Sequence, residues 1–262
     1  MLVFAAFVPH PPLILPNIGR DAALQFPKTK AAFDHLETEL YAAKPDTVVI
    51  ISPHGTVLFD AFLINLADQY VTDFSEFGDV STALTWRPNV RFVEDFRSSA
   101  GINTPVTVTS ERELDHGAAV PLTLLLNHLP NVSIVPISYS LLDLPAHVTF
   151  GAALKEYLAR TNQRVAVIAS GDLSHRVGPD SPAGFSELGV KFDVQIQELV
   201  RTKNLNQLLK LDPKMVEEAR ECGLRSLVTL FGIMQEYNYQ TNILAYESPF
   251  GVGHLTAQFV LR

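Results

Sequence analysis

Short apolar runs and helical patterns alternate along the chain. Runs rich in β-branched and small apolar residues at 2–8, 47–51 and 165–170 have the composition of strands that are buried on both faces. Residues 21–43 place apolar side chains at helical spacing, with an irregularity near Pro27. This β-α-β order predicts parallel strands that are joined by a right-handed crossover.

The same alternation continues to the end of the sequence. Strand-like runs occupy 61–66 and 131–138, helical patterns occupy 89–100, 118–126, 146–160, 185–203 and 224–236, and 204–221 predicts two short helices. Residues 242–247 and 254–261, separated by glycines, predict a closing hairpin. We interpret the Gly/Pro-rich loop at 177–184 as a lid. The whole pattern predicts one α/β domain over 1–262, with a central, mostly parallel or mixed sheet flanked by helices on both faces.

The composition indicates where the protein is located and which classes of partner are excluded. The 262 residues are 47% apolar, enough for a sizeable core, and the formal net charge of −8 argues against nucleic-acid or anionic-membrane partners, which favour basic patches. No apolar run approaches the ~20 residues of a membrane-spanning helix, and residues 1–8 lack the features of a signal peptide. Cys222 is the single cysteine, which excludes an intramolecular disulfide. We therefore expect a cytoplasmic protein that binds neither nucleic acid nor membrane.

Histidines follow three of the predicted strands directly. His10 lies after the first strand, His54 after the second, and His175 after the strand at 165–170. The carboxyl ends of parallel strands meet at one edge of a sheet, where open α/β folds bind their ligands, so we expect these histidines to lie close together. His116 belongs with them, because it opens the predicted helix that follows it.

These residue types suit a metal centre with proton-transfer groups. Neutral imidazole is the commonest metal ligand, and two histidines with one carboxylate are typical of non-heme Fe(II) oxygenases. His10 and His54 lie in short loops with proline or glycine neighbours, so we expect them to be metal ligands. His175 and His116 suit general acid/base catalysis. Asp172 is placed either to orient His175 or to cap a turn. The remaining histidines are interpreted as structural: His35, His128, His147 and His254.

Four motifs together resemble a known superfamily. The motifs are VPHPP at 8–12, SPHG at 52–55, ELDHG at 113–117 and SGDLSH at 170–175. In order and spacing they resemble the catalytic subunit of class III extradiol ring-cleavage dioxygenases, and equally the related Memo proteins. The dioxygenase resemblance implies Fe(II) bound by His10 and His54, acid/base catalysis by His175, and a second acid/base or substrate-orienting role for His116. It also implies a small aromatic diol and O2 as substrates.

The third metal ligand is left open between two neighbouring residues. The dioxygenases that this sequence resembles use a glutamate from a late helix, whereas Memo proteins use a cysteine in a CG-type motif. The corresponding stretch here, RECG at 220–223, offers both Glu221 and Cys222. Glu221 would preserve a hard site suited to Fe(II), and Cys222 would make a softer one suited to Cu or Zn. We rank Glu221 first, Cys222 second and Glu247 third, although a free cysteine is more often a small buried apolar residue.

Three functions are compatible with these residues. The leading hypothesis is an extradiol dioxygenase, an oxidoreductase that incorporates both atoms of O2 into a catecholic ring. The second is a Memo-like metal-binding protein without ring-cleavage activity, and the third is a zinc-dependent hydrolase on the same scaffold. The sequence names no substrate, and the position of the two terminal strands leaves room for a homo-oligomer paired at an exposed sheet edge.

Overall fold

A mixed β-sheet forms the centre of the computed structural model, which describes residues 1–100 and 104–262. The strands in this part of the chain are β1 (Leu2–Val8), β2 (Thr47–Ser52), β3 (Phe62–Asn65), β4 (Tyr70–Thr72), β5 (Thr85–Pro88), β6 (Val106–Thr109), β7 (Glu113–Leu114), β8 (Ser133–Ser138), β9 (Val165–Ser170), β10 (Tyr239–Glu247) and β11 (His254–Leu261). Their order is β10-β11-β1-β9-β2-β8-β5-β4-β7, and β3 pairs with both β6 and β8. The central strands β1, β9, β2 and β8 are parallel, so their carboxyl ends share one edge.

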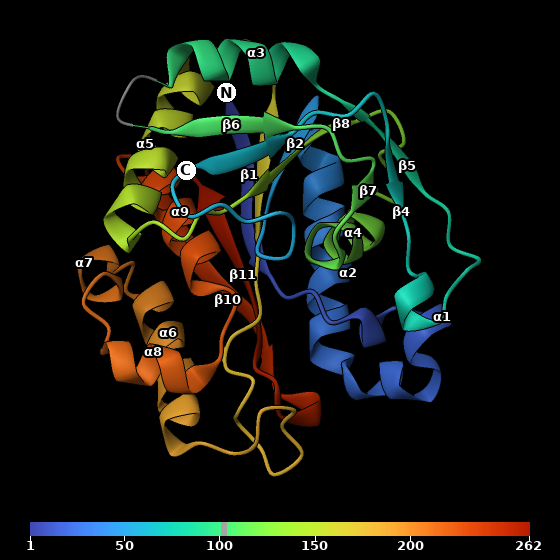
Figure 1. Ribbon diagram of the computed structural model, residues 1–262, viewed down its shortest axis with the longest axis vertical. Helices are drawn as coiled ribbons and strands as arrows, with labels where there is room; N and C mark the ends of the chain where they lie inside the picture. The colour runs from blue at the N-terminus through green and yellow to red at the C-terminus, as the bar shows by residue number, and fades with distance from the viewer. Residues whose placement is uncertain (101–103) are drawn as a thin grey trace.

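Helices cover both faces of this sheet. They are α1 (Pro16–Gly19), α2 (Pro27–Ala43), α3 (Val90–Ser99), α4 (His116–Leu125), α5 (Leu144–Arg160), α6 (Glu187–Arg201), α7 (Leu205–Leu208), α8 (Pro213–Ala219) and α9 (Leu224–Met234). Figure 1 shows α2 and α4 on one side of the central strands and α5 and α9 on the other. The predicted α/β fold with helices on both faces is confirmed. Within the described residues, none of the helices is both long and apolar enough to cross a membrane.

The central strands separate two apolar cores. Every residue of β9 is buried, and successive side chains point to opposite faces of the sheet. Val165 and Val167 therefore enter the core beneath α5 and α9, while Ala166 and Ile168 enter the core beneath α2 and α4. This two-sided burial explains why the strand is an uninterrupted apolar run in the sequence.

The long elements lie close to their predicted ranges, and the differences have local causes. The helical pattern at 21–43 divides at Pro27: Arg20–Gln25 is a 3-10 segment, and α2 begins at the proline. Proline suits the first position of a helix because the missing N–H has no intrahelical partner there. The short strands β4, β5, β6 and β7 were not predicted, since two to four residues are too few to establish a period.

The loop at 177–184, interpreted from the sequence as a lid, is hydrogen-bonded to the turn between β10 and β11. The Val177 N–H donates to the Gly251 carbonyl at 3.1 Å, and the buried Ser181 hydroxyl donates to the same carbonyl at 2.8 Å. Gly251 has a φ of 72°, and a Cβ there would lie 2.2 Å from the Ser181 Oγ atom, so the contact requires glycine. These bonds argue against a lid.

Candidate metal centre

The carboxyl ends of β1 and β2 bring two histidines together beside the only cysteine. The Nε2 atoms of His10 and His54 lie 3.0 Å apart, and the Cys222 Sγ atom lies 3.6 Å from His10 Nε2. One potential ligand atom from each of these three side chains falls within 4.8 Å of the other two. β9 lies between β1 and β2, and it adds Asp172 and His175 at the same edge of the sheet. The structure thus brings together His10, His54 and His175, as the strand-end pattern predicted.

A hydrogen-bond chain fixes the protonation of His10. The Ser170 hydroxyl donates to the Gly117 carbonyl, and its oxygen lies 2.8 Å from His10 Nδ1. The serine oxygen therefore accepts the Nδ1–H, which leaves the Nε2 lone pair directed at His54. Burial lowers the pKa of His10 to about 4. Desolvation and the neighbouring imidazoles lower the pKa of His54 to about 3. Both rings are neutral at pH 7, which is the state that binds a metal ion.

Cys222 reaches this cluster because two glycine turns touch. A Cβ on Gly171 would lie 2.2 Å from the Cα of Gly223, and a Cβ on Gly223 would lie 2.9 Å from the Asp172 carbonyl oxygen. Backbone bonds join the same turns: the Asp172 N–H donates to Cys222 Sγ at 3.3 Å, and the Cys222 N–H donates to the Asp172 carbonyl at 3.3 Å. Burial raises the pKa of the Cys222 thiol. The thiolate therefore requires a cation beside it.

The two glutamates considered as third ligands lie in other environments. The Glu221 carboxylate accepts the Leu224 N–H at 2.6 Å in the first turn of α9, and burial raises its pKa to about 7. Glu247 accepts the N–H groups of Lys28 and Thr29 at 3.3 and 2.7 Å and so caps α2. Among the described residues, neither glutamate joins a group with metal-ligand spacing. The geometry favours Cys222, which the sequence ranked second.

Asp172 lies among three histidines. Its Oδ1 atom accepts the backbone N–H of His10 at 3.1 Å, and its Oδ2 atom lies 3.6 Å from the ring Nε2 of His10. Asp172, His175 and Cys222 form a second group with ligand atoms within 4.8 Å. Burial would raise the pKa of Asp172, but the imidazoles of His10, His254 and His175 outweigh it and hold that pKa below its ordinary value. The Nε2 atom of His175 is buried and has no hydrogen-bond partner among the described residues.

His254 is the member of this cluster that the sequence reasoning missed. It is 2% exposed, and its Nε2 atom lies 3.9 Å from Asp172 Oδ1. His254 begins β11, which is antiparallel to β1, so the start of β11 lies beside the end of β1. The GVGH sequence at 251–254 was a weak local signal, because only the pairing of β11 with β1 brings the histidine to the site.

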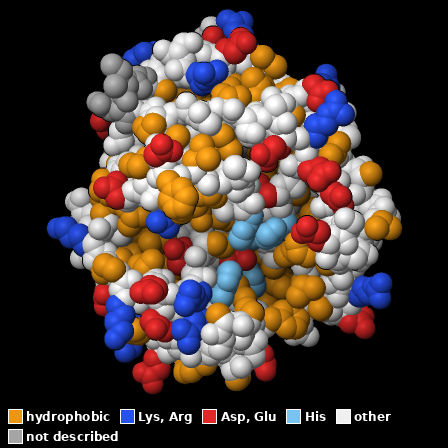
Figure 2. Space-filling view, in the orientation of Figure 1, with side chains coloured by type: hydrophobic (Ala, Val, Ile, Leu, Met, Phe, Trp, Pro, Cys, Tyr) orange, Lys and Arg blue, Asp and Glu red, His pale blue; other side chains and the backbone are white. Residues whose placement is uncertain are grey.

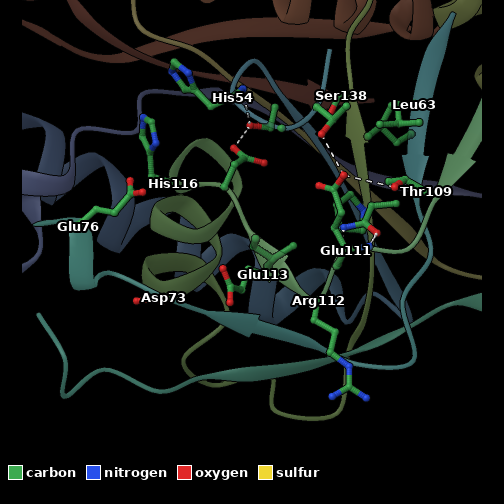
Figure 3. A pocket seen from close by; sticks show the side chains of 18 of the residues that line it. His54, Leu63, Asp73, Glu76, Thr109, Glu111, Arg112, Glu113, His116 and Ser138 are labelled. Carbon is green, nitrogen blue, oxygen red and sulfur yellow. Dashed lines mark hydrogen bonds between the residues drawn. The ribbon is translucent and has the colours of Figure 1, made fainter. Parts of the chain in front are cut away.

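His116 lies beside His54 at the start of α4. The two rings are stacked with centroids 4.2 Å apart, and the Phe77 ring meets His116 edge-on at 5.4 Å. Asp115 caps α4 by accepting the Ala118 N–H at 3.1 Å, and it also accepts the Ser52 hydroxyl. This cap holds His116 at the wall of a cavity of about 610 Å³ (Figure 3). Figure 2 shows histidines gathered in a hollow of this face, with acidic side chains nearby.

Known proteins are similar in sequence to most of this chain. The sequence is 29% identical over 257 residues to protein CA_C1420 of Clostridium acetobutylicum, which covers 94% of this chain and 55% of that protein, so the chain spans about half the length of this relative. It is 21% identical over 294 residues to the 2-aminophenol 1,6-dioxygenase beta subunit of a Pseudomonas species, which covers 99% of this chain and 94% of that subunit.

A solved structure and a family match complete the comparison. The crystal structure of the uncharacterized protein JW3007 from Escherichia coli K12 has a TM-score of 0.73 and 15% sequence identity over 98% of this chain and 99% of that one, which shows a shared fold. The resemblance to ring-cleavage dioxygenases is confirmed at the level of the family. Residues 4–259 match the family described as the catalytic LigB subunit of aromatic ring-opening dioxygenase, and this chain belongs to that family.

Proposed function

We propose that this protein is a metal-dependent enzyme that opens a catecholic ring with O2, at a metal ion held by His10, His54 and Cys222. The observation that carries the proposal is the meeting of two neutral imidazoles, with Nε2 atoms 3.0 Å apart, beside the Cys222 sulfur at 3.6 Å. Family membership supports aromatic ring opening as the class of reaction. The ligand set and the catecholic substrate are inferred from the side chains that surround this point.

The donor set fits a divalent transition metal. Two imidazole nitrogens and one thiolate are ligands of Fe(II), Zn(II) and copper, and Fe(II) is the ion that we expect for oxygen chemistry. Fe(II), when bound there by His10, His54 and Cys222, would bind the two diol oxygens and O2 and mediate the transfer of electrons from the catechol to O2. The protein contributes the fixed His10 tautomer, through Ser170, and a backbone N–H directed at the Cys222 sulfur.

His175 is the proposed acid/base group. One of its ring nitrogens lies within 4.8 Å of ligand atoms of Asp172 and Cys222, and its Nε2 atom has no hydrogen-bond partner among the described residues, so the ring can accept a proton from a substrate hydroxyl held at the cluster. Asp172 stabilises positive charge on the surrounding imidazoles. His116, stacked on His54 at the cavity wall, orients the ring or acts as a second acid/base. The proton of the substrate hydroxyl moves to His175 Nε2 and returns from it to the opened product.

A metal-binding protein without ring-opening activity is the second candidate. The observation that favours it is the thiol of Cys222 in the position where the related dioxygenases are expected to have a carboxylate. A thiolate makes the site softer and favours copper or zinc over Fe(II). The same fold then serves to hold the ion.

Metal content and oxygen uptake test both candidates. Protein purified without oxygen or chelators is compared with the His10→Ala/His54→Ala double variant, and with Cys222→Ser and Glu221→Gln as a matched pair. We expect roughly one ion per chain in the parent and in Glu221→Gln, and loss from the other two variants. Oxygen uptake with a panel of catechols supports ring opening. Bound metal without oxygen uptake supports the second candidate, ester hydrolysis with bound zinc indicates a hydrolase, and a parent that binds no metal refutes the site.

A further inference from the structure

We propose that the cavity beside His54 and His116 binds a positively charged substituent of the substrate, such as a protonated amine carried on a short side chain. This inference rests on the proposed function and names the class of substrate. Three properties of the cavity carry it: where it begins, what its walls offer to a ring, and how its charges are distributed.

The cavity begins at the metal-binding cluster itself. Its wall includes His54, whose Nε2 atom meets His10 at 3.0 Å, and His116, which is stacked on His54. Its inner end is therefore one imidazole ring away from the proposed metal position. A substituent on a ring held at the cluster has this space to extend into, past His116 (Figure 3).

The size and the apolar part of the wall suit an organic ligand. A volume of about 610 Å³ lies within the range of small-molecule sites and exceeds the needs of an unsubstituted ring. Leu63 and Ile137, 4% and 1% exposed, form part of the wall, and Phe77 presents its ring near His116. These contacts offer an apolar surface to the aromatic part of the ligand.

The charged part of the wall is almost entirely negative. The lining carboxylates are Asp73, Glu76, Glu111, Glu113 and Asp115. Arg112 is the one lysine or arginine among the described lining residues, and it donates to Asp68 at 2.8 Å, outside the lining. Figure 3 shows its side chain directed away from the space between Glu76, Glu111 and Glu113.

The spacing of these carboxylates favours an organic cation over a bare metal ion. In the described part of the chain, the groups with metal-ligand spacing are the two around Cys222, and no three cavity carboxylates form another. Glu111 is held at one side of the cavity by the Thr56 hydroxyl, at 2.9 Å, while Glu76 lies on the side of His116. Acidic groups distributed around a cleft create a negative potential that attracts a mobile cation without coordinating it.

Three catechols of nearly equal size and different charge test the inference. The probes are 4-(2-aminoethyl)catechol, neutral 4-ethylcatechol and 3,4-dihydroxyphenylacetate, and their binding to the metal-loaded protein is measured by calorimetry without oxygen. We expect the cation to bind about tenfold more tightly than the anion at low salt, with the neutral probe between them. The preference should shrink as ionic strength rises above about 0.1 M, since salt screens charges that face an open cavity.

Variants that remove a carboxylate charge test whether the cavity carboxylates cause the preference for the cationic probe. Glu76→Gln/Glu113→Gln keeps the shape of two exposed side chains, and Glu94→Gln removes an exposed carboxylate on α3, outside the cavity. We expect the double variant to lose about threefold to tenfold of the cation preference, and the control to keep it. Equal affinity for all three probes, no binding of any probe, or a preference that survives in the double variant would overturn the inference. Oxygen uptake tests the proposed ring opening separately. A protein that prefers the cationic probe but takes up no oxygen would refute ring opening and leave the inference about the cavity intact.

Discussion

Ser170→Ala tests how the protein controls His10. The serine side chain is fully buried, its oxygen lies 2.8 Å from His10 Nδ1, and its hydroxyl donates to the Gly117 carbonyl. Alanine removes the acceptor of one buried group and the donor of the other. It also removes the bond that keeps the proton of His10 on Nδ1, and so permits the tautomer with a proton on Nε2, the atom that faces His54.

The magnitude follows from these two bonds. A buried polar group left without a partner costs ~1–3 kcal/mol, so for two such groups we expect the unfolding free energy of the metal-free protein to fall by about 2–6 kcal/mol. Loss of a hydrogen bond that orients a ligating histidine typically weakens metal affinity by ~10–100-fold. Metal affinity should therefore fall by about that factor, because part of the population has Nε2 protonated.

Urea unfolding of the metal-free protein and competition with a chromophoric chelator measure the two effects. Ser226→Ala is the matched control: Ser226 is also fully buried, but its hydroxyl has no partner among the described residues, so its removal breaks no hydrogen bond. Metal affinity in Ser170→Ala equal to that of the parent, despite a lower unfolding free energy, would refute the role assigned to the serine. No change in either quantity would refute the hydrogen-bond chain itself.

Three further predictions follow from the same geometry. His175→Ala should retain metal and lose roughly a hundredfold in turnover; loss of metal measured by elemental analysis would contradict that role. Gly223→Ala should cost about 1–3 kcal/mol by overpacking and lower metal affinity, since the new Cβ would lie 2.9 Å from both the Asp172 carbonyl oxygen and the Phe7 ring; unchanged affinity would show that the contact of the turns does not position Cys222. Burial raises the pKa of Asp193 to about 7. The folded state therefore binds more protons than the unfolded state between pH ~4 and 7, and the unfolding free energy of the protein falls as pH rises through this range. Asp193→Asn should therefore lose less unfolding free energy than the parent between pH 5 and 8, by an amount on the order of 3 kcal/mol; parallel pH profiles of the two proteins would contradict this.

The histidines of the site followed from the sequence because the relevant rule is local. His10 and His54 each come two residues after a buried strand, and parallel strands bring such positions to one edge of the sheet. Glu221 and Cys222 could not be separated in this way, since they are neighbours on one turn. Their directions depend on the contact of Gly223 with Gly171, residues that are far apart in the sequence.

His254 and the cavity depended on tertiary structure in a similar way. No local pattern states that β11 is antiparallel to β1, although this pairing alone brings His254 beside Asp172. The cavity is bounded in part by β3, β6 and β7, strands of two to four residues. The run at 61–66 predicted β3, but β6 and β7 are too short to show a hydrophobic period, and only the tertiary pairing of the strands brings the lining carboxylates around one cavity.

The contact between His10 and Cys222 joins residues 212 positions apart in the chain. Synthesis proceeds from the N-terminus, so a growing chain has both histidines long before it has the sulfur. The three proposed ligands are together only after the chain has been made through Cys222 and has folded around it. We therefore expect the proposed ion to bind after this part of the chain has folded, and by mass action to stabilise the folded state over earlier, incompletely folded states.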